Sequence, residues 1–186
     1  PQVSFSIKMR LGWENPDECL KLLPAINDLP LRQVTMHPRL GKQQYKGEVD
    51  LKRFAAFMDA CKHPVVYNGD INSLQDFQQI RDRFPALAGI MIGRGLLANP
   101  ALALECGQGK VLSPDEMAQK LQSMHQSVYT AYAGQLEGGD AQLLNKMKTF
   151  WEYLLPDADK KLLKAIHKST TLSKYNQAVS AFFNRR

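Results

Sequence analysis

The sequence has few cysteines and no long apolar run. Its three cysteines, Cys19, Cys61 and Cys106, are odd in number and scattered, which excludes a disulfide framework and a CxxC metal site. No stretch approaches the roughly 20 apolar residues of a membrane span. No charged start followed by an apolar run indicates a signal peptide. These absences predict reduced structural thiols, no metal site, no membrane association and a cytoplasmic location.

The chain is hydrophobic enough to bury a core, and its positive charge is unevenly distributed. Hydrophobic residues make up 44% of the 186 residues, and the formal net charge is +6. Between Asp140 and Arg186 there are nine Lys or Arg against four Asp or Glu, a net of +5. A basic segment with interleaved aromatics is typical of RNA binding, although a solvated helix face has the same composition. The sequence starts at Pro1, without Met, and a strand-like pattern begins within a few residues. We therefore expect this start to be a cut and not a natural N-terminus.

Strand-like and helix-like patterns alternate through the first half of the chain. Residues 3–10 alternate apolar and polar, which predicts a strand, and Asn15 and Pro16 predict the cap and first position of a helix to about Asp28. Further strands are predicted at 32–37, 64–67 and 88–92, with helices at 51–61 and 74–84. This alternation indicates parallel β/α units, in an open doubly wound sheet or in part of a barrel.

The last part of the chain has only helical patterns. Ser113, Pro114 and Glu116 predict a capping box with proline at the first helical position, and this helix reaches about Gly134. Further helices are predicted between Leu143 and Pro156 and at 160–168 and 174–183. We therefore expect a small helical bundle, with its boundary in the 107–112 stretch.

Polar residues follow each predicted strand, at the end where active sites form in β/α folds. They are Lys8 and Arg10, then His37 and Arg39, then Asn68, Gly69 and Asp70, and finally Gly93, Arg94 and Gly95. Alternation places Lys8 and His37 opposite the aliphatic side chains. In a barrel the aliphatic face packs on the helices, so these two residues would point inward at the mouth. Each motif alone is common, but four in order at successive strand ends favour a functional site.

These motifs resemble the tRNA-dihydrouridine synthase family in order and spacing. The matching segments are 8–13, 37–39 with 45–47, 64–71, and 91–95 with 99–100, so the resemblance covers about residues 3–100. The helical tail also resembles the RNA-binding domain of that family. One departure is Pro38, where the family usually has glycine, and it affects the local backbone of that turn.

The resemblance implies an α/β fold in which residues 1–108 supply strands five to eight of an FMN-binding TIM (β/α)8 barrel. Residues 109–186 would form an all-α helical tRNA-binding domain. The implied FMN-binding residues are Lys8, His37, Asn68, Gly69, Asp70, Gly93 and Arg94. The implied tRNA-binding residues are Arg10, Arg39, Tyr45, Lys146, Lys160, Lys164 and Lys168. Phosphate sites of such barrels are commonly built from the loops after strands seven and eight, which agrees with this placement.

The implied reaction is the reduction of uridine to 5,6-dihydrouridine in tRNA. Hydride passes from reduced FMN to C6 of a flipped-out uracil, a cysteine acid protonates C5, and NADPH restores the flavin. In the family that cysteine lies upstream of Pro1, so we expect no catalytic residue in this chain and no activity from it alone. Two other interpretations stay open, namely another FMN barrel oxidoreductase acting on a small molecule and a non-catalytic RNA-binding module. The open strand edges of a partial barrel would also allow self-association.

Overall fold

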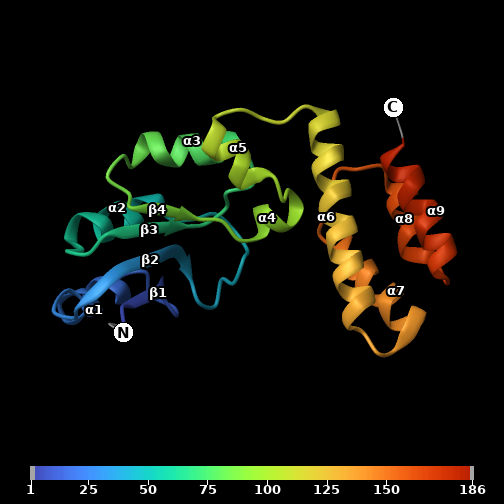
Figure 1. The fold of residues 1–186 in the computed structure, drawn as a ribbon. Helices are drawn as coiled ribbons and strands as arrows, with labels where there is room; N and C mark the ends of the chain where they lie inside the picture. Colours follow the sequence, from blue (N-terminus) through green and yellow to red (C-terminus); the bar gives the residue numbers. More distant parts are fainter. Residues whose placement is uncertain (1–2, 185–186) are drawn as a thin grey trace. The chain divides into compact units, whose positions relative to one another are not determined.

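The computed structural model describes residues 3–184, which form four strands and nine helices (Figure 1). The chain divides into two compact units, Pro1–Gly95 and Leu96–Arg186. Among the described residues, no helix is long and apolar enough to cross a membrane. Likewise, no group of His, Cys, Asp and Glu within residues 3–184 is arranged to hold a metal ion.

The first unit is a parallel sheet whose strands alternate with helices, as the sequence predicts. The strands lie side by side in chain order (Figure 1): β1 (Phe5–Gly12), β2 (Leu31–Leu40), β3 (Val65–Asn68) and β4 (Gly89–Met91). The connecting helices are α1 (Glu18–Asn27), α2 (Leu51–Ala60) and α3 (Leu74–Arg83). All strand pairs are parallel, so the carboxyl ends of the strands meet at one edge.

One face of the sheet packs on the helices. Met36 of β2 is opposite Tyr67 of β3, and the ring of Tyr67 meets Phe54 of α2 edge-on at 5.0 Å between centroids. Met36 and Phe54 are fully buried. The prediction that the apolar side chains of β1 pack on the helices fails at Phe5, which is 64% exposed and lies before a register shift at the start of the strand, whereas Ile7 and Met9 are half-buried.

The second strand is longer than predicted and contains a bulge at its end. His37 pairs with Arg10 and Leu40 with Gly12, so two residues of β2, Pro38 and Arg39, face one residue of β1. A bulge tolerates proline because the missing N–H does not interrupt a regular ladder, and it re-aims the neighbouring side chains. The departure from glycine at position 38 is thus accommodated within the strand, and the carbonyl of Pro38 accepts the backbone N–H of Asp50 at 2.8 Å.

The start of the first helix differs from the prediction. Asp17, not Asn15, is the N-cap residue, and its side chain makes no capping hydrogen bond. The carboxylate of Glu18 instead accepts the backbone N–H groups of Trp13 at 2.9 Å and of Asn15 at 2.8 Å. These bonds lower the pKa of Glu18. The turn after β1 is therefore organised by a side chain that follows it in sequence.

The rest of the described chain, which includes the second unit, is helical, and the boundary between the two units falls within its first helix. Two short helices, α4 (Arg94–Ala98) and α5 (Leu102–Gln108), were not predicted, because each is too short to show a helical repeat and Asn99-Pro100 separates them. The others are α6 (Pro114–Gln135), α7 (Gly139–Phe150), α8 (Lys160–Lys168) and α9 (Leu172–Phe183). The predicted capping box of Ser113 and Glu116 is confirmed. Trp151, Tyr175, Met147 and Ile166 are fully buried in the core of this unit.

Candidate functional site

The strand ends bring the polar motifs of the first unit onto one face. Lys8 pairs with Thr35 and Arg10 with His37, and partners in a parallel sheet direct their side chains to the same side. Thr35 in turn pairs with Val66, which gives Asn68 the same parity two residues later. The amide of Asn68 donates to the carbonyl of Met91 at 2.8 Å and so links the ends of β3 and β4. The predicted face for Lys8 and His37, opposite the helices, is confirmed.

The loop after β3 is held by a buried ion pair. Arg39 is 2% exposed and donates to both carboxylate oxygens of Asp70, at 2.7 and 2.6 Å, and also to the carbonyl of Gly47. Two parallel bonds to one carboxylate fix the planes of both groups. The hydrogen bonds from Arg39 hold the pKa of Asp70 below its usual value. Asp70 itself has φ +42°, a conformation that this pairing helps to maintain.

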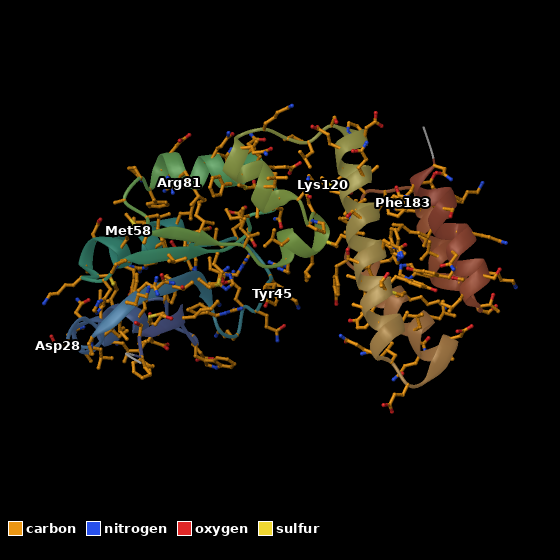
Figure 2. All side chains as sticks on the ribbon, in the orientation of Figure 1. Asp28, Tyr45, Met58, Arg81, Lys120 and Phe183 are labelled. Atoms are coloured by element: carbon orange, nitrogen blue, oxygen red, sulfur yellow. The ribbon has the colours of Figure 1, made fainter. Side chains whose placement is uncertain are left out.

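A second arginine also pairs with the carboxylate of Asp70. Arg94 donates to Asp70 at 3.1 Å, and its guanidinium lies 4.2 Å from the ring centre of Tyr45. Arg10 approaches the same ring at 5.5 Å and donates to the carbonyls of Leu40 and Gln44, both at 2.8 Å. Tyr45, labelled in Figure 2, is thus held by cation–π contacts from two strand ends while remaining 59% exposed.

His37 lies beneath these charges. It is 4% exposed, and its Nε2 has no hydrogen-bond partner within the described residues. Burial, with the charges of Arg10, Lys8 and Arg39, lowers the pKa of His37 to about 4. The imidazole is therefore neutral at physiological pH, with a buried polar atom that only a bound molecule or water can satisfy.

Two glycines at the strand ends have opposite surroundings. A Cβ at Gly69 would lie 3.0 Å from Val49 Cγ1 and 3.5 Å from His37 Cδ2, so this position is closely packed. A Cβ at Gly93 would meet nothing within 4 Å. The backbone of Gly93 is therefore open to a ligand, whereas that of Gly69 is needed for packing.

We call Lys8, Arg10, His37, Arg39, Asp70 and Arg94 the strand-end cluster. It contains four cationic side chains and one carboxylate, since His37 is neutral. Such a concentration of donors suits an anionic ligand. Arg39 is buried and paired, so the geometry gives it a positioning function; its predicted contact with tRNA stays a prediction. The cluster can bind an anion beside a neutral imidazole.

The predicted tRNA-binding lysines of the tail lie in the second unit. Lys146, Lys160, Lys164 and Lys168 are all exposed. In α8, Ile166 is buried and Leu162 and Leu163 are half-buried, so the apolar and the basic side chains lie on separate faces of this helix. Arg185 and Arg186, which the sequence count included, lie outside the described residues.

One buried polar network was missed from the sequence. His125 of α6 is 6% exposed, and its Nε2 lies 2.6 Å from the hydroxyl of Tyr175, which also accepts the indole N–H of Trp151 at 2.9 Å. The available signal was the position of His125 four residues after Leu121 and three before Val128, within the apolar stripe of the helix.

Comparison with known proteins places these features in a family. The profile of the family described as dihydrouridine synthase (Dus) matches residues 2–184. A tRNA-dihydrouridine(16) synthase of Pseudomonas syringae pv. tomato is 38% identical over 54% of this chain and 32% of its own length. One of Haemophilus ducreyi is 32% identical over 53% of this chain and 30% of its own length.

A further relative is matched over more of the chain. A probable tRNA-dihydrouridine synthase of Rickettsia bellii is 27% identical over 74% of this chain and 44% of its own length. The matches thus span about a third to under a half of the curated relatives. Since the family profile covers nearly the whole sequence, the chain belongs to the dihydrouridine synthase family.

Proposed function

We propose that the chain supplies strands five to eight of the FMN-binding barrel of a tRNA-dihydrouridine synthase, together with its RNA-docking helical domain from residue 109. The enzyme reduces uridine to dihydrouridine in tRNA, with NADPH as the electron source. The observation that carries the proposal is the buried His37 within the strand-end cluster, whose Nε2 has no partner among the described residues and which feels the charges of Arg10, Lys8 and Arg39. In a closed barrel, an anionic planar cofactor bound over the mouth would lie at this imidazole and could satisfy its Nε2.

The residues of the cluster fit FMN. The open backbone at Gly93 and the exposed guanidinium of Arg94 offer donors to a phosphate, and Asn68 and Gly69 border the same loop edge. Lys8 is exposed on the inner face of β1 and would hold negative charge on the flavin ring. When bound, FMN supplies the hydride chemistry. The ion pair of Arg39 with Asp70 keeps the phosphate-side loop in place.

The remaining residues are suited to the RNA substrate. Tyr45 is exposed yet held in place by Arg94 and Arg10, so its ring can stack on a base without losing much rotational freedom. His37 is neutral, so it can form a hydrogen bond with the uracil or the flavin without adding charge. The lysines at 146, 160, 164 and 168 would contact tRNA phosphates.

The chain alone should bind FMN weakly and should not make dihydrouridine, because the acidic cysteine and the other half of the flavin cradle belong to the preceding half-barrel. The test is incubation with FMN, NADPH and unmodified tRNA, followed by quantification of dihydrouridine. Product above background, or tight copurification of yellow flavin, would contradict the half-barrel assignment. Comparison of FMN with riboflavin isolates the phosphate contribution, since only FMN should lose affinity when Arg94 is replaced by Ala.

We also propose that the exposed edges of the described sheet, β1 and β4, allow self-association. Sedimentation over a range of concentrations tests this. A strictly monomeric chain at high concentration would contradict it.

A further inference from the structure

A groove in the helical unit is lined by side chains from α6 and α9. Its cavity volume is about 280 Å³, near the lower end of the roughly 300–1,000 Å³ of small-molecule sites. The lining residues, all within the described part of the chain, are Gln122, His125, Gln126, Tyr129, Asn176, Val179, Ser180 and Phe183. We call this the α6–α9 groove. Figure 2 labels Phe183, at the end of α9.

The groove has a buried floor and polar walls. His125 and Val179 are buried, Tyr129 and Phe183 are half-buried, and the carboxamides and the hydroxyl of the walls are exposed. Within the described residues, Gln126 donates to Thr130 at 3.2 Å, while the side-chain amides of Gln122 and Asn176 have no protein partner. Each amide offers both a donor and an acceptor. None of the lining side chains carries a formal charge while His125 is neutral.

One ring nitrogen of His125 is hydrogen-bonded within the core. The Tyr175 hydroxyl accepts the Trp151 N–H, so its single hydrogen goes either to His125 Nε2 at 2.6 Å or to the carbonyl of Met147 at 3.5 Å. His125, Tyr175 and Trp151 thus share one buried hydrogen-bond network. Burial lowers the pKa of His125 and raises that of Tyr175 to about 12, so both groups are neutral. His125 is therefore a neutral, buried residue at the floor of the groove.

These features select a class of ligand. Carboxamides that both donate and accept match the edges of nucleobases, and aromatic rings provide faces on which unpaired bases stack. The lining side chains, all among the described residues, carry no formal charge, which disfavours a phosphate or carboxylate as the group they bind. We propose that the α6–α9 groove binds one unpaired nucleobase of an RNA, with Gln122 and Asn176 reading its edge and Tyr129 and Phe183 contacting its face.

This inference deepens the proposed RNA docking by the helical domain and rests on it for its biological setting. Its chemistry is distinct, because a base contact adds affinity without releasing counterions, whereas the lysine contacts act on phosphates. Experiments can therefore contradict base binding by the groove without contradicting phosphate binding by the lysines, and the reverse. A free nucleoside has no phosphate, so its binding tests the groove without the lysines.

The experiment is a titration of the isotope-labelled chain with adenosine, guanosine, cytidine and uridine, followed by nuclear magnetic resonance. At least one nucleoside should shift the side-chain amide signals of Gln122 and Asn176. The exposed amides of Gln119 and Gln177, on the same helices but outside the groove, should not move. No shift at the groove with any nucleoside up to its solubility, or equal shifts at the control amides, would overturn the proposal.

Variants then test the named contacts. Gln122→Ala with Asn176→Ala should weaken binding of the shifting nucleoside about tenfold or more, as expected for loss of amide–base hydrogen bonds. Gln119→Ala with Gln177→Ala is the matched control and should leave binding unchanged. All four residues are exposed, so the helical unit should remain folded, which the backbone spectrum checks. Undiminished binding in the groove variant would also overturn the assignment.

Discussion

Replacing Asp70 with Asn should loosen the sheet around Arg39. Arg39 is 2% exposed, and Asp70 is the only carboxylate among the described residues that pairs with it. An uncompensated buried charge costs about 3–5 kcal/mol. Asp70 is 32% exposed and Arg39 keeps the carbonyl of Gly47, so we expect a cost reduced below that range, to about 2–3 kcal/mol. At 1.36 kcal/mol per factor of ten, this predicts amide exchange in β2 that is about 30- to 150-fold faster.

Hydrogen exchange followed by mass spectrometry measures this effect in the peptides covering 34–39, apart from any change in the helical unit. Asp59→Asn is the matched control, because Asp59 is exposed on α2 and should have no effect. Exchange of β2 in Asp70→Asn indistinguishable from that of the wild-type chain would refute the argument that this ion pair organises the strand ends.

Three further outcomes follow from the same geometry. Because the pKa of His37 is 6.5 in the unfolded chain and about 4 in the folded chain, the unfolded state binds the proton first, so acidification from pH 6.5 toward pH 4 should lower the stability of the wild-type relative to that of His37→Gln by up to about 3 kcal/mol in chemical denaturation. Gly69→Ala should cost about 1–3 kcal/mol in denaturation experiments, whereas Gly93→Ala should be nearly neutral. Lys8→Met should weaken FMN binding several-fold in a fluorescence titration, and Lys52→Met should not; equal effects would reject the flavin contact.

The order of the elements was predictable from the sequence because each signal is local. Alternation in β1 and the capping box before α6 depend only on neighbouring residues, and both are found where predicted. The end of β2 was not predictable, since its bulge depends on pairing with β1. The start of α1 was also placed too early, because Asn15 accepts the N–H of Asp17 within the turn before the helix, while the carboxylate of Glu18 accepts the N–H groups of Trp13 and Asn15.

The candidate site was likewise predictable only where the signal is local in sequence. Parity placed Lys8 and His37 on the inner face, but it gave no indication that Arg39 is buried against Asp70 or that Arg94 lies over Tyr45. The two residues of each contact are separated by 31 and by 49 positions in the sequence, respectively. Only the folding of the sheet brings them together. The role of His125 was likewise not predictable, because its partner Tyr175 lies 50 residues later in the sequence.

The most direct test of the proposed RNA function is tRNA binding across a salt series. The wild-type chain should lose affinity linearly in a plot of log affinity against log salt, and replacing Lys160, Lys164 and Lys168 with Ala should reduce the slope by up to about three units. A control triple, Lys21, Lys52 and Lys62 to Ala, removes the same charge from exposed positions of the first unit and should leave the slope unchanged. Indistinguishable curves for the wild-type and the α8 variant would contradict RNA docking through this face.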